Sequence, residues 1–153
     1  MKNPILILAL ALMLCVQEAD AWGVLGHRAI AEIAEQNLTP EAKAATQKYL
    51  NGSLPSVALW MDRTASWTKK RKGHIPGWEQ TSVWHTLVVD EKYPPSVKTT
   101  PKGSGKLVPA LKMCVENLKN YRNLTDSAVA VNLKCVIHMV GDMHCPTHIY
   151  YLE

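Results

Sequence analysis

The stretch TDSAVAVNLKCVIHMVGDMHCP, residues 125–146, contains both a clear helix signal and the densest polar chemistry of the chain. Thr125-Asp126-Ser127 is typical of a helix N-terminus, and Pro146 marks the limit of the helix that follows. His138 and Asp142 are four residues apart, so they lie one turn apart on the same helical face. We therefore expect one long helix that holds an imidazole and a carboxylate side by side.

The rest of the sequence predicts further helices and little sheet. Thr39 followed by Pro40 is a helix start, and Asn51-Gly52 is a helix stop. Only Trp84–Val89 suggests a strand, and it is short. Apolar residues at helical spacing predict four more helices, over Gly26–Asn37, Pro40–Leu50, Pro55–Lys70 and Leu107–Leu118. The expected fold class is all-α with loops, in a single domain.

The first residues have the features of a secretory signal peptide. Lys2 is followed by the apolar run Ile5–Val16 and by the small-x-small pattern Ala19-Asp20-Ala21. A membrane anchor is the alternative, but about 12 apolar residues are too few for the roughly 20 that span a bilayer. We expect cleavage after Ala21, a secreted or periplasmic location, no transmembrane anchor and a mature chain that begins at Trp22.

The net charge and the cysteine content exclude few classes of function. The formal net charge is +4, which suits a polyanionic substrate but is also common in proteins without one. Removal of the signal peptide leaves Cys114, Cys135 and Cys145. One disulfide with one free thiol fits this odd number, and so do three free thiols.

A metal site is one explanation of the His138 and Asp142 pair. Their helical face otherwise holds apolar residues, so both side chains point inward, and a buried charge without a partner is costly. A metal ion satisfies both groups, whereas a His–Asp hydrogen bond without metal is the alternative. His148 follows Pro146, so the chain can turn it back towards the same ion. At the mature N-terminus, the α-amine of Trp22 lies five residues ahead of His27, and an α-amine has a reference pKa of about 7.7–8.0.

Together with Asp62 in Trp60-Met61-Asp62 and His85 in Trp84-His85, these motifs resemble the S1/P1 nuclease family. This family comprises secreted nucleases with three zinc ions, and zinc-dependent phospholipases C share its fold. The resemblance runs from Trp22 to the end of the chain, through the WGxxGH start, the Trp-His pair and HxxGDxHxPxH. It implies a single mainly helical domain of the phospholipase C/P1 nuclease type, of which residues 22–153 are the N-terminal portion after a signal peptide at residues 1–21.

The resemblance also implies the metal ligands and their roles. Asp62 would in addition orient the attacking water, which makes it the candidate catalytic residue. The implied zinc ligands are Asp62, His85, His138 and Asp142 for one ion, Trp22, His27 and a bridging Asp142 for a second, and His148 for a third. In the family, the third ion takes a further histidine and aspartate from a later segment, and this chain ends at Glu153. We therefore expect the C-terminal part of the domain to be lacking and two of the three Zn²⁺ ions to be supportable.

The implied activity is zinc-dependent hydrolysis of phosphodiester bonds in single-stranded DNA and RNA. The products would be 5′-phosphorylated, with 3′-nucleotidase activity alongside. Nucleic acid or nucleotides are the expected partners, and no stable protein partner is implied. Two alternatives remain, a zinc-dependent phospholipase C and an inactive truncated remnant that binds zinc.

Overall fold

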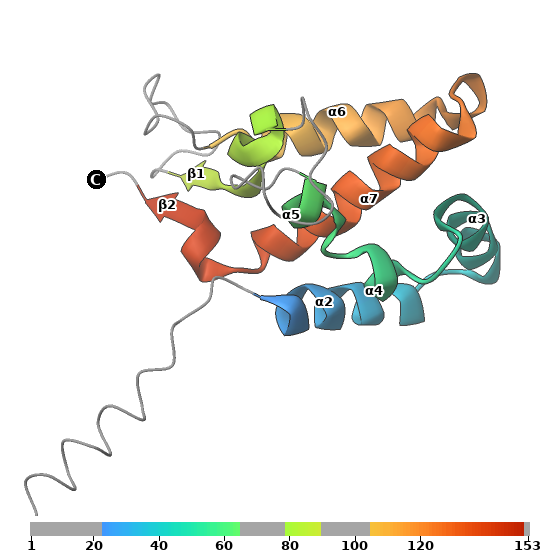
Figure 1. The fold of residues 1–153 in the computed structure, drawn as a ribbon, viewed down its shortest axis with the longest axis horizontal. Coiled ribbons are helices and arrows are strands. Elements are labelled where there is room, and N and C mark those ends of the chain that lie inside the picture. The colour runs from blue at the N-terminus through green and yellow to red at the C-terminus, as the bar shows by residue number, and fades with distance from the viewer. Residues whose placement is uncertain (1–22, 65–78, 90–104, 152–153) are drawn as a thin grey trace, which may run out of the picture.

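The computed structural model describes residues 23–64, 79–89 and 105–151. The all-α class is confirmed, because two three-residue strands are the only sheet in these ranges (Figure 1). The helices are α2 (Val24–Gln36), α3 (Pro40–Leu50), α4 (Leu54–Val57), α5 (Trp60–Thr64), α6 (Leu107–Lys119) and α7 (Asp126–Met143). Short 3₁₀ helices span Glu79–His85, Tyr121–Asn123 and Pro146–His148, and the strands are β1 (Leu87–Val89) and β2 (Ile149–Tyr151). The expected signal peptide and Trp22 lie outside the described residues.

Two threonine caps begin the helices that the sequence predicted most clearly. The Thr39 side-chain oxygen accepts a hydrogen bond from the Ala42 backbone N–H at 3.2 Å, which starts α3. Asn51 ends this helix in the left-handed conformation, with φ of 51°. Thr125 starts α7 in the same way, accepting from the Ala128 N–H at 3.2 Å. Such caps satisfy donors that a helix leaves free at its first turn, so the local sequence determines these ends.

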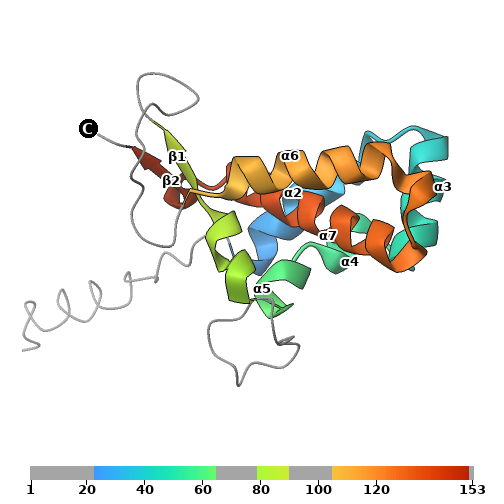
Figure 2. The same ribbon diagram turned by 90° about the horizontal axis from the view of Figure 1, so that it is seen from above.

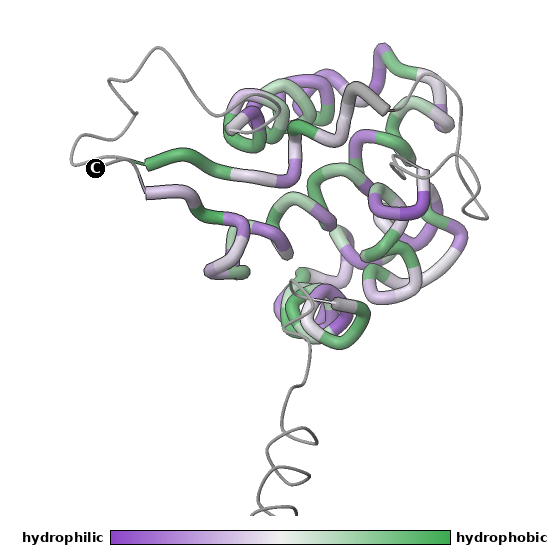
Figure 3. Tube along the Cα trace, turned by 60° about the vertical axis from the view of Figure 1, so that its left-hand side comes forward, coloured by the Kyte–Doolittle hydropathy of each residue, from purple (hydrophilic) through white to green (hydrophobic). Residues whose placement is uncertain are grey.

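Helix α7 lies at the centre of the molecule, with α6 along one side and α2 and α4 along the other (Figures 1 and 2). The helices on both sides of α7 are amphipathic, so hydrophobic and hydrophilic residues alternate along the tube in Figure 3. One core cluster lies between α6 and α7, and a second lies between α2, α3, α4 and the opposite face of α7. The first contains Met61, Leu107, Ala110, Cys114, Cys135 and Met139, and the second contains Ala31, Leu50, Leu54 and Ala58.

The antiparallel pair α6 and α7 has a defined register. The Asn117 side-chain amide donates to the Asn132 Oδ1 atom at 3.0 Å, which places these two residues at the same level. Cys114 lies one turn before Asn117, and Cys135 lies one turn after Asn132. In an antiparallel pair they therefore face each other, and both are buried in the same cluster. All three described cysteines have free thiols.

The prediction of one helix over residues 55–70 was wrong within the described part. Helices α4 and α5 are separate, with a break at Ala58–Leu59, and residues 65–70 lie outside the described ranges. The cause is a tertiary contact, because the Ala58 carbonyl accepts a hydrogen bond from the His138 Nδ1–H at 2.7 Å. The Ala58 carbonyl therefore accepts a hydrogen bond from α7, whereas in one continuous helix it would accept from a backbone N–H four residues later.

The strand prediction over residues 84–89 was correct only for its last three residues. Trp84 and His85 belong to a 3₁₀ helix, and β1 begins at Leu87. β1 pairs in parallel with β2, a strand that the sequence did not predict, and Leu87 is paired with Ile149. None of the helices in the described ranges has the length and apolar character needed to cross a membrane.

Candidate metal centre

Asp142 is the central residue of a cluster of imidazole and carboxylate groups in which it makes contact with four histidines. It lies in the last turn of α7 and is completely buried. Its Oδ2 atom lies 3.0 Å from His85 Nδ1 and 3.2 Å from His138 Nε2. Its Oδ1 atom lies 3.3 Å from His27 Nε2 and 3.0 Å from His148 Nδ1. The two oxygens thus face two different sets of nitrogen atoms.

The set on the Oδ2 side has the dimensions of a tetrahedral zinc site. His85 Nδ1 and His138 Nε2 are 3.0 Å apart. Asp62 Oδ1 adds a fourth corner, 3.7 Å from His85 Nδ1 and 3.4 Å from His138 Nε2. Zinc bonds of 2.0–2.1 Å in a tetrahedron require ligand atoms about 3.3–3.4 Å apart. The five measured distances of 3.0–3.7 Å lie around that value, and the ligand atoms of Asp62, His85 and His138 are close enough to one another to share an ion.

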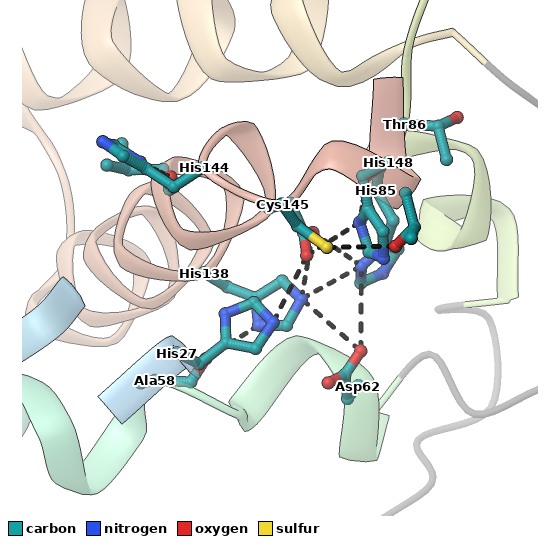
Figure 4. A network of polar contacts seen from close by, with 12 residues as sticks. His27, Ala58, Asp62, His85, Thr86, His138, His144, Cys145 and His148 are labelled. Carbon is teal, nitrogen blue, oxygen red and sulfur yellow. Dashed lines mark hydrogen bonds and ion pairs between the residues drawn. The ribbon is translucent and has the colours of Figure 1, made fainter. Parts of the chain in front are cut away.

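The set on the Oδ1 side comes from the two ends of the described chain. His27 lies in the first turns of α2, and its ring stacks on His138 with centroids 4.2 Å apart and planes 13° apart. Figure 4 shows His27 and His138 lying face to face, with His85 and His148 together on the other side of the cluster. Two sets of three residues have ligand atoms close enough to share an ion, namely His27 with His138 and Asp142, and Asp62 with His85 and His138.

Parallel pairing of β1 and β2 brings His85 and His148 together. The register that pairs Leu87 with Ile149 places the residues just before the two strands side by side. The His148 Nδ1–H donates to the His85 carbonyl at 2.8 Å and also lies near Asp142. Two residues 63 positions apart therefore reach one site through a sheet of only three residues per strand.

Backbone carbonyls set the tautomers of two of these imidazoles. The His138 Nδ1–H donates to the Ala58 carbonyl, and the His148 Nδ1–H donates to the His85 carbonyl. In each ring the Nε2 atom is then left as the nitrogen with a lone pair. Metal-binding histidines commonly have such a hydrogen bond on the other ring nitrogen. The role of the Ala58 carbonyl was not predicted, because no side-chain motif marks it.

Electrostatics favour an ionised carboxylate at the centre. Burial works against the Asp142 charge, but the close approach of the four surrounding histidines outweighs it and holds the pKa of Asp142 well below its usual range. Burial also disfavours protonated His138, yet its hydrogen bond to Asp142 and the nearby negative charges raise the pKa of His138. The nearby Asp142 carboxylate likewise raises the pKa of His148. The cluster thus contains negative charge that attracts cations.

A buried carboxylate oxygen supports a cation as the missing partner. Asp142 Oδ1 makes no hydrogen bond of acceptable geometry. Two imidazole nitrogens lie within 3.3 Å of this oxygen, but they are poorly aligned with it. Carboxylate and imidazole atoms that converge without saturating one another are the donor set that zinc prefers.

The structure brings together six of the seven predicted ligands, namely His27, Asp62, His85, His138, Asp142 and His148. The seventh, Trp22, lies outside the described residues. His144 lies outside the cluster, because its Nδ1–H donates to the Val140 carbonyl at 2.7 Å and the residue is exposed (Figure 4). Cys145 is buried, lies 3.0 Å from the Thr147 hydroxyl and belongs to neither ligand set among the described residues.

The profile of the family described as S1/P1 Nuclease matches residues 22–152, nearly the whole chain after the expected leader. The chain belongs to the S1/P1 nuclease family. Among curated relatives, it is 27% identical to Endonuclease 4 of Arabidopsis thaliana over 94% of this chain and 50% of that protein. It is 25% identical to Nuclease P1 of Penicillium citrinum, over 83% of this chain and 47% of that protein.

A third relative is Nuclease S1 of Aspergillus oryzae, which is 26% identical over 94% of this chain and 49% of that nuclease. The chain therefore spans about half the length of the curated relatives it matches. S1/P1 nucleases are zinc-dependent hydrolases of phosphodiester bonds, and the histidine and aspartate sets described above are able to bind such an ion.

Proposed function

We propose that this protein is a zinc-dependent endonuclease that cleaves phosphodiester bonds in single-stranded DNA and RNA and releases 5′-phosphorylated products. The observation that carries the proposal is the convergence of Asp62, His85, His138 and Asp142, with measured separations of 3.0–3.7 Å, in a chain of the S1/P1 family. We include 3′-nucleotidase activity in the proposal, since the same chemistry acts on a terminal phosphomonoester.

The proposed ligands divide into the sets that face the two oxygens of Asp142. Asp62, His85, His138 and Asp142 hold one ion, while His27, Asp142 and the mature N-terminus at Trp22 hold a second. His148 is the proposed first ligand of a third ion. This scheme requires cleavage after Ala21, because an uncleaved Trp22 has an amide nitrogen in place of an amine. Residues 1–21 are accordingly the proposed signal peptide, residues 22–153 the N-terminal portion of the nuclease domain, and the location is secreted or periplasmic.

Bound zinc would supply Lewis-acid chemistry, by polarising a phosphoryl oxygen and lowering the pKa of a water molecule. The roles of the two aspartates differ because their exposure to solvent differs. Asp142 is fully buried and acts only as a ligand, whereas Asp62 is 33% exposed. Asp62 is therefore the carboxylate able to accept a hydrogen bond from an attacking water at the solvent side. The two carboxylates offset only half the charge of two divalent ions, so the site stays attractive to a phosphodiester anion.

The test compares substrates and metal states of the full chain. We expect cleavage of heat-denatured DNA, little cleavage of duplex DNA, loss of activity after chelation and recovery with Zn²⁺. Asp62→Asn should abolish turnover with the fold intact, while Asp126→Asn, an exposed acid at the other end of α7, should leave it unchanged. Cleavage that survives chelation would overturn the proposal. Hydrolysis of short-chain phosphatidylcholine without DNA cleavage would indicate the phospholipase, and tightly bound zinc without turnover would indicate the inactive remnant.

A further inference from the structure

Gly141 lies directly against the His27 ring. A Cβ atom added at this position would be 2.4 Å from His27 Nδ1, 3.1 Å from Cε1 and 3.4 Å from Cγ. We propose that Gly141 is a positioning residue of the metal centre, whose missing side chain provides the space in which His27 reaches Asp142. The inference rests on the proposed function in that it assigns His27 to a metal ion.

The backbone of α7 does not itself require glycine at this position. Gly141 lies within the helix, and the only described glycine with positive φ is Gly105. Glycine is a poor helix former, since it loses more backbone entropy on folding than alanine. An alanine would therefore stabilise the last turn of α7 if the neighbouring space were open. The reason for glycine must lie in what packs against it.

The His27 ring cannot give way without leaving the site. It is buried, one face stacks on His138, and its Nε2 atom lies 3.3 Å from Asp142 Oδ1. To restore an ordinary contact of 3.4 Å to a new Cβ, the Nδ1 atom has to move by about 1 Å from its 2.4 Å position. Metal–ligand distances tolerate only about ±0.2 Å. A single methyl group at residue 141 is therefore expected to displace His27 as a ligand.

The three atoms nearest to the new Cβ all belong to His27, so the effect should be selective. Gly141→Ala should thus weaken the ion held by His27 and Asp142 and keep the ion held by the Asp62 set. An effect of this kind on one of two ions distinguishes a positioning role from a general loss of stability.

The test is a double-mutant cycle of the full chain with Gly141→Ala, His27→Ala and the double variant, melted in the presence of chelator. With His27 present, Gly141→Ala should lower the Tm because the methyl group clashes with the ring. With His27→Ala as background, the clash is gone and helix propensity remains, so the same change should raise the Tm by about 3 °C. This reversal of sign does not depend on metal binding or on activity.

Zinc content per chain is the second readout. Gly141→Ala and His27→Ala should each lose the same ion, and the double variant should lose no more than either. Gly52→Ala is the matched control, since a Cβ there meets only the exposed Ser56 side chain, which is not part of the cluster. It should keep the zinc content of the unmodified chain.

Two results would overturn the inference. One is a Tm change of the same sign in both backgrounds, which would mean that Gly141 does not act through His27. The other is an unchanged zinc content in Gly141→Ala when His27→Ala loses an ion. If the unmodified chain binds no zinc, the proposed function fails by itself, and the reversal of sign still decides whether Gly141 creates the space for His27.

Discussion

Replacement of Asp142 by asparagine is the sharpest perturbation of the metal centre. The two side chains have the same shape, so the core around residue 142 stays filled. The change replaces one carboxylate oxygen by an NH₂ group and removes the negative charge. One of the two sets of histidine nitrogens, at 3.0–3.3 Å from the carboxylate oxygens, then faces a donor. The other set faces a neutral amide oxygen, which is a poorer ligand.

The size of the effect follows from the number of ligands. Binding of zinc to a four-ligand protein site contributes about 10–16 kcal/mol, or about 2.5–4 kcal/mol for each ligand. The loss of one ligand therefore weakens binding by about 100- to 1,000-fold. Because Asp142 faces both sets, Asp142→Asn should weaken two ions by this amount. Asp62→Asn should weaken only one, since the contacts of Asp62 are with His85 and His138 alone among the described histidines.

The assay is competition with a chromophoric chelator, combined with elemental analysis of zinc per chain. Circular dichroism at the same temperature checks that both variants are folded. The reasoning is refuted if Asp142→Asn keeps two ions with affinities within tenfold of the unmodified chain. It is also refuted if Asp142→Asn and Asp62→Asn lose the same single ion, because Asp142 would then not bridge the two sets.

Two further predictions concern the chain without metal and its thiols. The pKa of Asp142 is lowered in the folded state, which stabilises the fold at pH values above the ordinary pKa of 3.8, and this stabilisation is lost as the pH falls. The pKa of His138 is raised in the folded state, which stabilises the fold at pH values below the ordinary pKa of 6.5, and this stabilisation is lost as the pH rises. The Tm of the chelator-treated chain should thus be highest between about pH 4 and about pH 6.5, and a Tm that still rises towards pH 8 would contradict this. Cys114 and Cys135 are buried, so they react only when the structure opens locally. A hydrogen bond from the Cys135 thiol lowers the pKa of Cys114, so slow oxidation by oxidised glutathione should link these two facing cysteines and leave Cys145 reduced. Peptide mass mapping checks the linkage, and a disulfide to Cys145 would contradict the prediction.

Local signals predicted the parts of the fold that local chemistry determines. The caps at Thr39 and Thr125 and the stop at Asn51 were read correctly, because each depends on contacts within one helical turn. The break at Ala58 was missed, because a histidine 80 residues away takes its carbonyl. The strand β2 was missed for the same reason, since three residues form a strand only where β1 lies beside them.

In the candidate site, too, the sequence predicted what local spacing determines and missed what tertiary packing determines. The spacing of His138 and Asp142 was enough to place both on the inner face of α7, where both are fully buried. The positions of Asp62 and His85 came only from the family resemblance, because each reaches the cluster through tertiary packing. His148 was also expected at the site from the turn at Pro146. Gly141 was part of the quoted motif, but its purpose is invisible in the sequence. Only the 2.4 Å approach of the His27 ring gives the glycine a physical reason.

Folding and metal binding are expected to be coupled in this half-length chain. Helix α7 contributes to both core clusters, so its central position depends on packing from α6 and from α2 at once. The same helix buries a carboxylate surrounded by four histidines, an arrangement that is stable only when charge and hydrogen bonds are balanced. An ion that binds the folded state alone stabilises it by RT ln(1 + [L]/Kd), about 4 kcal/mol at a thousandfold excess over Kd. A native stability of roughly 5–15 kcal/mol is typical for a domain, so zinc would contribute a large share of what holds α2, α5 and α7 together.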